Sequence, residues 1–177
     1  MPEAGRFGFG YVREPVRGHE QYDGFLAIPY LRRNLRGAWS ACSIRFRCLQ
    51  DHDHTGHGKY MTVRDDPPWL YNTAALQSDS TTVAITEGEL DAVTAELCGI
   101  RAVGVPGSTV WKRHWRSLFV GFNEVLILAD GDDAGTQFGN RVSADLPNAR
   151  VVSMPPGQDV NSLFVQWGKQ ALLEGIS

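Results

Sequence analysis

Two stretches in the second half of the chain decide the fold: VAITEGELD at residues 83–91 and VLILADGDDAG at residues 125–135. Each begins with a short apolar run that is typical of a buried strand. Each then reaches a glycine-containing acidic turn, which holds Glu87 in the first stretch and Asp130 and Asp132 in the second. Helical sequence follows both turns. Short apolar strands that alternate with helices predict a parallel sheet covered on both faces.

The same alternation continues through the rest of the second half. We expect strands at residues 83–85, 102–105, 125–129 and 150–152. We expect the helices that accompany them at residues 89–98, 110–119, 133–146 and 160–174. Together these elements predict an α/β domain over residues 81–177, with a central parallel sheet flanked by helices.

The first half has a different, strand-rich pattern. Short apolar runs separated by turn residues predict a small α+β subdomain over residues 22–80. Residues 42–48 alternate in character, and the apolar face of this expected strand carries Cys42, Ile44, Phe46 and Cys48. Residues 1–21 are rich in glycine and arginine and lack periodicity, so we expect a loose N-terminal arm there.

Acidic residues come shortly after three of the expected strands. In open α/β sheets, functional groups gather just beyond the carboxyl ends of the strands. That place is occupied here by Glu87, Asp130, Asp132 and Asp159. Carboxylate oxygens are hard ligands that suit Mg²⁺ or Mn²⁺. We therefore predict a divalent-metal site with Glu87, Asp130 and Asp132 at its centre.

The Asp-Gly-Asp tripeptide at residues 130–132 also fits roles other than metal binding. A simple turn is the commonest role of such a tripeptide, and this alternative stays open. A calcium loop of the EF-hand type is excluded, because Ala134 and Arg141 stand where its fifth and twelfth positions need oxygen ligands. A Walker A phosphate-binding loop does not occur in the sequence.

Three motifs of the second half resemble those of the TOPRIM domain. Residues 83–92 resemble its first motif, and residues 128–135 resemble its Asp-x-Asp motif. Residues 156–163 resemble the later acidic motif of bacterial and phage replicative primases. The loop at residues 104–108 resembles the glycine-bearing loop between the first two motifs, and the whole resemblance spans residues 82–168.

This resemblance implies roles for individual residues. The family's metal-binding acids fall on Glu87, Asp130, Asp132 and Asp159, of which the first three are also the implied catalytic acids. The family's supporting acid falls on Asp91. Asn161 stands where the family often has a further aspartate, so that ligand is weakened or replaced in this chain.

The first half resembles the strand-rich N-terminal subdomain in the RNA-polymerase domain of DnaG-type DNA primases. The similar segments are residues 25–29, 32–37, 58–60 and 70–72. The family places a Lys-Tyr pair and a Leu-Tyr/Phe-Asn segment shortly before the TOPRIM motif, as this chain does. The resemblance implies synthesis of short RNA primers from ribonucleoside triphosphates on a single-stranded DNA template, with two Mg²⁺ or Mn²⁺ ions.

Two other functions remain open, because TOPRIM domains also occur in nucleases, topoisomerases and recombination proteins. One is a metal-dependent TOPRIM nuclease that uses the same acids, and the other is a non-catalytic nucleic-acid-binding module. The chain carries no zinc-ribbon module and no helicase-binding module of the primase type, and the helical subdomain after the TOPRIM part is missing. A split phage primase is therefore expected, with a replicative helicase or a second primase polypeptide as partner.

Charge is distributed unevenly along the chain. Residues 24–50 contain five arginines and no acid, whereas residues 81–177 contain 7 Lys or Arg and 11 Asp or Glu. A basic stretch beside an acidic half suits a protein that holds a polyanion near bound cations, although an ordinary solvated face would look similar. The residues expected to contact nucleic-acid phosphates are Arg32, Arg33, Arg36, Arg45, Arg47 and Lys59.

The chain has one cluster of zinc-ligand residue types: Cys42, Cys48, His52, His54 and His57. Their spacing matches no common zinc finger or ribbon. Because Cys42 and Cys48 lie on the expected apolar strand face, we expect both to pack as small hydrophobic residues. Zinc is therefore not the expected cofactor.

The overall composition is that of an ordinary globular protein, with 42% hydrophobic residues, 21% charged residues and a net charge of −3. No apolar run approaches the roughly 18 residues that a membrane span needs. The N-terminus lacks the features of a signal peptide, and three cysteines give no disulfide framework. We expect a cytoplasmic protein without membrane contact, located in the host cytoplasm if a phage encodes it.

Overall fold

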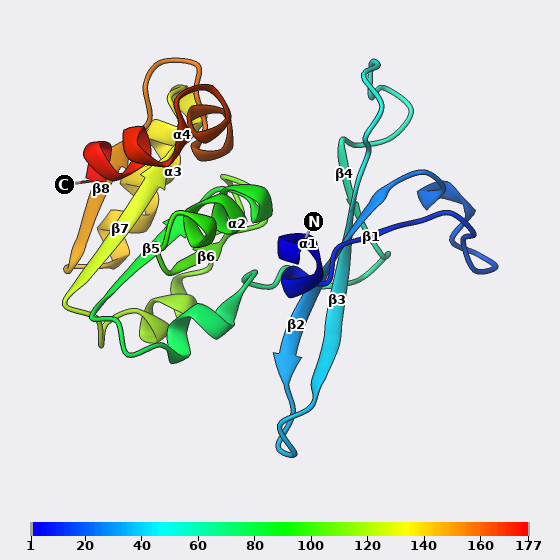
Figure 1. The fold of residues 1–177 in the computed structure, drawn as a ribbon, viewed down its shortest axis with the longest axis horizontal. Helices are drawn as coiled ribbons and strands as arrows, with labels where there is room; N and C mark the ends of the chain where they lie inside the picture. The colour runs from blue at the N-terminus through cyan, green and yellow to red at the C-terminus, as the bar shows by residue number, and fades with distance from the viewer. Residues whose placement is uncertain (1, 177) are drawn as a thin grey trace. The chain divides into compact units, whose positions relative to one another are not determined.

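The computed structural model describes residues 2–176, which are drawn in Figure 1. The chain divides into two compact units, Met1–Pro67 and Pro68–Ser177. Each unit contains one four-stranded sheet, and the two sheets differ in strand direction. Over the described residues, no helix combines the length and the apolar character that a bilayer crossing requires.

The second unit is built on a parallel sheet with the strand order β6-β5-β7-β8 (Figure 1). Its strands are β5 (Thr82–Thr86), β6 (Ala102–Gly104), β7 (Glu124–Ala129) and β8 (Ala149–Ser153). All three strand pairings are parallel, and helical segments return the chain from one strand to the next. The predicted α/β architecture with a central parallel sheet is confirmed.

Three α-helices cover this sheet: α2 (Glu89–Leu97), α3 (Asp133–Asp145) and α4 (Val160–Ile176). Helix α3 packs against β7 and β8, whereas α2 packs against β5 and β6 and also contacts α4. In Figure 1, α2 lies in front of the strands and α3 behind them. Both faces of the sheet are therefore covered, which explains the continuous buried apolar runs at residues 83–85 of β5 and 125–129 of β7.

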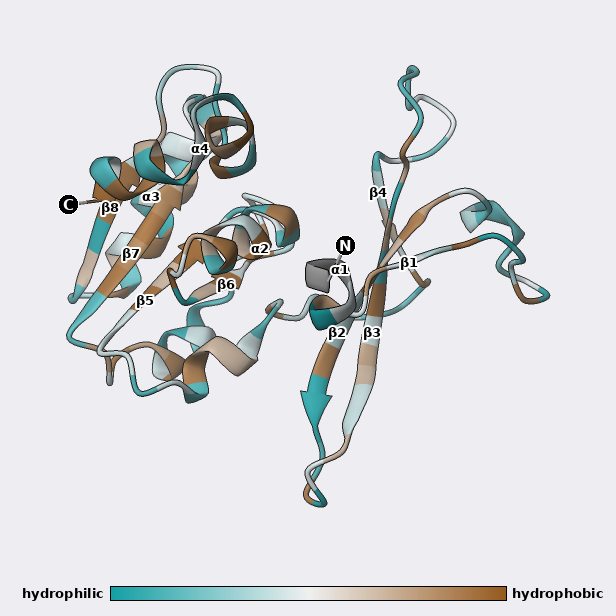
Figure 2. Cartoon of the chain, viewed as in Figure 1, coloured by the Kyte–Doolittle hydropathy of each residue, from teal (hydrophilic) through white to brown (hydrophobic). Residues whose placement is uncertain are grey.

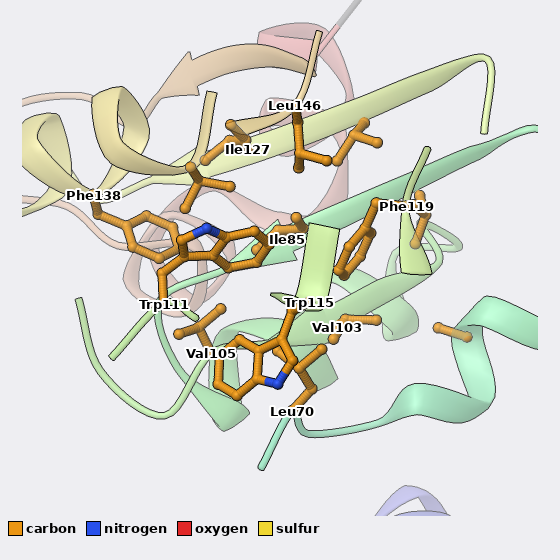
Figure 3. Packing of buried hydrophobic residues seen from close by; sticks show 14 residues of the cluster. Leu70, Ile85, Val103, Val105, Trp111, Trp115, Phe119, Ile127, Phe138 and Leu146 are labelled. Carbon is orange, nitrogen blue, oxygen red and sulfur yellow. The ribbon is translucent and has the colours of Figure 1, made fainter. Parts of the chain in front are cut away.

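The face under α3 carries the main hydrophobic core, which Figure 3 shows from close by. Ile85 and Ile127 project from the strands toward Phe138 of α3. Trp111 and Trp115 complete this layer, with their ring centroids 5.8 Å apart in an edge-on arrangement. Both come from the segment before β7, which forms a 3₁₀ helix (Arg113–Leu118) where a longer helix was predicted.

The first unit contains an antiparallel sheet with the strand order β1-β2-β3-β4. Its strands are β1 (Gly10–Tyr11), β2 (Leu26–Arg33), β3 (Trp39–Arg47) and β4 (Tyr60–Thr62). The β2–β3 hairpin dominates the unit, and Figure 2 shows that β2 becomes hydrophilic toward the turn. Phe7, Ile28 and Tyr30 are buried in this unit, and a small buried cluster consists of Tyr22, Phe25, Phe46 and Cys48. Its central contact is the stack of Tyr22 on Phe46, with ring centroids 3.9 Å apart.

The pairing of β2 with β3 contains a bulge at Cys42. Tyr30 pairs with Ser43, and the next pair is Leu31 with Ala41, so Cys42 is the extra residue. Its side chain is exposed, and its Sγ lies 3.2 Å from the Tyr30 carbonyl oxygen. The expectation that Cys42 packs on the apolar face is therefore wrong, because a bulge interrupts the strict alternation of a strand.

Two parts of the first half differ from their expected organisation. The expected loose arm over residues 1–21 contains α1 (Pro2–Phe7) and β1, which pairs with β2. Residues 68–80, expected in the first subdomain, lie in the second unit. Leu70 of this segment joins the core of the parallel sheet, and Tyr71 exchanges two backbone hydrogen bonds with Gly104 at the end of β6.

Candidate metal centre and nucleic-acid interface

The carboxyl ends of β5, β7 and β8 bring the candidate acids of the second unit to one edge of the sheet. Glu87 follows β5 directly, and Asp130 follows β7 directly. Asp132 stands at the start of α3, and Asp159 immediately precedes α4. Since neighbouring parallel strands end at the same edge, four residues distant in sequence come together.

Glu87 links the ends of β5 and β7. Its Oε1 accepts a hydrogen bond of 2.9 Å from the backbone N–H of Asp130, and the residue is only 8% exposed. Burial raises the pKa of Glu87, and Asp132 raises it further, whereas the hydrogen bond from Asp130 opposes both effects. One oxygen of Glu87 is thus fixed by the backbone.

Asp130 has the most perturbed carboxylate of the site. Burial, followed by the negative charges of Glu87, Asp91, Asp159 and Asp132, raises the pKa of Asp130 to about 8. Its Oδ1 is buried and has no hydrogen-bond partner among the described residues. A buried acceptor without a donor is costly in free energy.

Asp132 and Asp159 each cap a helix with one carboxylate oxygen. Asp132 Oδ1 accepts a hydrogen bond of 2.8 Å from the backbone N–H of Gly135 in α3. Asp159 Oδ1 accepts one from the backbone N–H of Ser162 in α4, and the Asp159 N–H donates to Ser162 Oγ in return. This reciprocal pair resembles a capping box. Capping accounts for one oxygen of each aspartate and fixes the direction of both carboxylates.

The turn after β7 depends on two glycines. A Cβ atom at Gly131 would overlap the carbonyl oxygen of Pro155, and one at Gly135 would overlap the carbonyl oxygen of Asp130. Gly131 also donates a backbone hydrogen bond of 2.8 Å to Gln158 and accepts one of 2.9 Å from Gly157. The loops that follow β7 and β8 are therefore packed backbone against backbone, which sets Asp130 and Asp159 side by side.

Asp91 lies behind this group, in the first turn of α2. The residue is 9% exposed, and its Oδ1 accepts a hydrogen bond of 3.1 Å from the backbone N–H of Asn161. Burial, followed by the charge of Asp159, raises the pKa of Asp91 to about 6. The side chain of Asn161 turns to α2 as well, because its Oδ1 accepts a hydrogen bond from Thr94 Oγ1. Asn161 thus joins α4 to α2.

The acids fit a hydrated divalent cation. None of the five carboxylates forms an ion pair with Lys, Arg or His in the described part of the chain. No three of them have oxygen atoms that all lie within 4.8 Å of one another. Mg²⁺ keeps several waters and binds through only one or two carboxylates at a time, so this spacing suits it. A cation would also satisfy the buried Oδ1 of Asp130.

The predicted phosphate-binding residues form two groups on the hairpin of the first unit. Arg32 and Arg33 end β2, and Arg36 lies in the turn that follows. Arg45 and Arg47 lie on β3, where both guanidinium groups pack on the ring of Tyr60 at 4.7 and 5.4 Å. Lys59 precedes Tyr60 and is exposed. The register separates the groups, since Arg32 pairs with Ser40 and Arg45 pairs with Ile28.

Two polar residues of the second unit were not predicted from the sequence. Ser162 holds Asp159, and its signal was the Asp-x-x-Ser spacing of a helix start. Glu96 is a buried acid with a purely structural environment, because it accepts hydrogen bonds from Asn72, Arg101 and the backbone of Ala102. Nothing in the local sequence distinguishes Glu96 from the acids of the site.

Comparison with known proteins agrees with this geometry. The Toprim-like family model matches residues 84–164. The Gene 57 protein of Mycobacterium phage D29 is 56% identical over 155 residues, which cover 88% of this chain and 99% of that protein.

Solved structures share the fold of both units. The DnaG catalytic core is similar with a TM-score of 0.75 at 22% identity, over 99% of this chain and 68% of that one. The RNA polymerase domain of Mycobacterium tuberculosis primase DnaG, in complex with double-stranded DNA, is similar with a TM-score of 0.77 at 18% identity, over 99% and 68%. This chain therefore belongs to one family with the phage Gene 57 protein, contains a Toprim-like domain over residues 84–164, and has the fold of the DnaG primase catalytic core.

Proposed function

We propose that this protein is a DNA primase-like nucleotidyltransferase that makes short RNA primers on a single-stranded DNA template. One observation carries the proposal. The buried, unpartnered Oδ1 of Asp130 lies among four other carboxylates at the ligand-binding edge of a primase-like fold. In their ionised form these crowded acids repel one another, and a divalent cation would stabilise that form. The proposed metal ligands are Glu87, Asp130, Asp132 and Asp159, with Asp91 as a supporting acid.

The protein's own contribution to the reaction would be to hold the metal-binding carboxylates in fixed positions. The backbone N–H of Asp130 holds Glu87, and the first turns of α3 and α4 hold Asp132 and Asp159. Each carboxylate thus keeps one oxygen for the site without having to reorganise. Two bound Mg²⁺ or Mn²⁺ ions would supply charge neutralisation at the α-phosphate of a ribonucleoside triphosphate, where a 3′-hydroxyl displaces pyrophosphate.

The basic hairpin of the first unit is the proposed template contact. Arg45 and Arg47 are held in place by Tyr60, so binding a phosphate would cost them less side-chain entropy than it costs a free arginine. Arg32, Arg33 and Arg36 would extend the contact toward the hairpin turn. The M. tuberculosis relative was solved with DNA, which supports nucleic acid as the ligand.

The proposed partners follow from the same family. The chain spans about two thirds of the DnaG cores that it matches. A replicative helicase or a second primase polypeptide is the proposed partner, since the primase fragment of the bacteriophage T7 primase-helicase protein shares the fold with a TM-score of 0.65. Since the Gene 57 relative is a phage protein, the proposed site of action is the cytoplasm of an infected host.

A primer-synthesis assay tests the proposal. The protein is incubated with single-stranded DNA, Mg²⁺ or Mn²⁺ and labelled ribonucleotides, alone and with the replicative helicase of its host. We expect metal-dependent oligoribonucleotides, and a loss on the order of 10²–10³-fold in Asp130→Ala. Asp133→Ala is the matched control, because Asp133 is an exposed acid in the same turn and should retain activity.

The products separate the competing functions. Shortened DNA strands without RNA synthesis would identify a Toprim nuclease that uses the same acids. Salt-sensitive DNA binding without turnover in every mixture would identify a non-catalytic module. Unchanged synthesis in Asp130→Ala would contradict the proposed role of the acids.

A further inference from the structure

The loop between β3 and β4 gathers one cysteine and three histidines in the first unit. Cys48 Sγ lies 3.9 Å from His52 Nε2, and His52 Nε2 lies 3.1 Å from His57 Nε2. The possible ligand atoms of Cys48, His52 and His57 all lie within 4.8 Å of one another. Within residues 2–176 these three form the only such group of Cys, His, Asp and Glu.

The spacing of these atoms is close to that of a zinc shell. With bonds of about 2.3 Å to sulfur and about 2.0–2.1 Å to nitrogen, tetrahedral zinc separates two nitrogens by about 3.4 Å and sulfur from nitrogen by about 3.6 Å. The observed 3.1 and 3.9 Å lie on either side of these values. The third separation, between Cys48 and His57, is at most 4.8 Å, so shifts of no more than about 1 Å would bring all three atoms to the ion.

The ring of His57 is already oriented for metal binding. Its Nδ1 lies 3.1 Å from the carbonyl oxygen of Gly58, and this oxygen can only accept a hydrogen bond. The proton therefore belongs on Nδ1, which leaves the lone pair of Nε2 directed at His52 and Cys48. A backbone carbonyl behind a histidine in this way is the usual outer support of a metal ligand.

His54 is a candidate for the fourth position. Its ring centroid lies 4.6 Å from that of His52 and 5.3 Å from that of His57. Its Nε2 is buried and has no hydrogen-bond partner in the described residues. No ligand atom of His54 lies within 4.8 Å of all three others, so its ring would have to turn toward the group, which would also give its unpartnered Nε2 a partner.

The fold gives such an ion a structural use. Cys48 is 5% exposed and belongs to the small core of the first unit, and its N–H donates to the Lys59 carbonyl oxygen at the base of the loop. The ring of His57 also packs on Phe25 of that core. Small domains with few buried residues commonly gain stability from a bound metal.

We propose that Cys48, His52 and His57 bind one Zn²⁺ ion, with His54 as the fourth ligand, and that the ion fastens the 49–59 loop to the end of β3. Binding displaces the thiol proton of Cys48 and leaves the histidines neutral. The site lies in the first unit and is separate from the acids of the second. The Cys-x3-His-x4-His spacing matches no common zinc motif, so pattern matching alone does not find it.

Cobalt substitution of the full chain tests the site directly. A thiolate bound to Co²⁺ gives a charge-transfer band in the near ultraviolet, which oxygen ligands such as the acids of the second unit cannot produce. Titration in excess Mg²⁺ should yield this band together with the visible bands of tetrahedral cobalt, and zinc should abolish both stoichiometrically. Purified protein should likewise contain stoichiometric zinc by metal analysis.

Matched variants assign the ligands. His52→Ala and Cys48→Ser should lower zinc affinity by about 100-fold or more, since even changes behind a ligand cost about 10–100-fold. Cys42→Ser and His114→Ala are controls that should bind zinc normally, because these residues lie outside the cluster. His52 is exposed, so its variant keeps the test valid if Cys48→Ser fails to fold. Absence of the charge-transfer band in the wild type, or its survival in Cys48→Ser, would overturn the proposal.

Discussion

The acidic edge of the second unit and the Cys/His loop of the first are both candidate metal sites, but they are assembled differently. The acids stand at or after the ends of parallel strands, so the sheet topology brings residues 87 and 130 together, and the packed loops after β7 and β8 add residue 159. The thiol and imidazoles come from one loop that closes between Cys48 and Lys59. A sheet-edge site can be located from the pattern of strands, whereas a loop site depends on how one short segment folds.

The two sites also differ in how strongly each destabilises the folded state when no metal is bound. Burial, and after it the negative charges of the neighbouring acids, raises the pKa values of Glu87, Asp91 and Asp130. The folded state therefore carries a penalty that a cation removes. Histidine clusters can remain neutral and carry no comparable charge repulsion. Metal removal should consequently strain the second unit electrostatically and loosen only a loop of the first.

The largest effect on stability is expected at Gly131, where the acidic edge depends on close packing of the backbone. Gly131→Ala should destabilise the protein by about 3 kcal/mol, because its Cβ would overlap the carbonyl oxygen of Pro155. Urea denaturation followed by circular dichroism measures the change. Gly121→Ala is the control, since a Cβ there meets nothing within 4 Å and should change stability by no more than about 0.5 kcal/mol.

The same variant sharpens the comparison between the sites. If the two sites are independent, Gly131→Ala keeps the cobalt–thiolate band of Cys48 while it weakens the stabilisation by Mg²⁺. Equal stabilities of the two glycine variants would contradict the backbone contact that joins the loops after β7 and β8.

The sequence located the acids because their positions follow from simple rules. Apolar strand runs end directly before Glu87 and Asp130, and carboxyl ends of parallel strands meet at one edge. Asp159 follows from the same rule, and the resemblance then added Asp91; the structure places both near Asp130. The structural role of Asn161 could not be predicted from the sequence, because its hydrogen bond from Thr94 joins two residues that are 67 positions apart in the chain.

The first half was harder to predict because its features are set by contacts between distant residues. The bulge at Cys42 depends on how β2 pairs with β3, and no local signal marks it. Cys48 is buried as predicted, whereas its closeness to His52 and His57 depends on how the loop folds and has no signal in the local sequence. The boundary near Pro68 was missed because Leu70 packs across to strands that follow it in the chain.

An effect of intermediate size is expected from pH on the stability of the protein. Rising pH should destabilise the metal-free acidic site, whereas it should strengthen the stabilisation by zinc at the Cys/His site. The folded-state pKa values of Asp130, about 8, and Asp91, about 6, lie above the ordinary value of 3.8. The folded protein therefore holds protons that the unfolded chain releases. Stability in EDTA should fall as pH rises from about 4 to about 8.

Thermal melts at several pH values, with EDTA or with Mg²⁺, measure this slope. Mg²⁺ should flatten it, because the cation binds the ionised acids, and Asp130→Asn should remove most of it. Zinc should instead stabilise the protein more at higher pH, since its ligands must be deprotonated. A melting temperature in EDTA that rises between pH 5 and pH 8 would contradict the coupling of the acids.

The smallest effects concern the basic groups of the first unit. Arg47→Gln and Arg36→Gln should each reduce the salt dependence of single-stranded DNA binding by about one unit of log K against log salt, because each removes one phosphate contact. Fluorescence anisotropy at several salt concentrations measures both slopes. Arg64→Gln is the control, since Arg64 is exposed in the same unit but lies outside both groups. A reduced slope for Arg47→Gln alone would confine the template to the face beside Tyr60, whereas three equal slopes would make the basic hairpin an ordinary solvated surface.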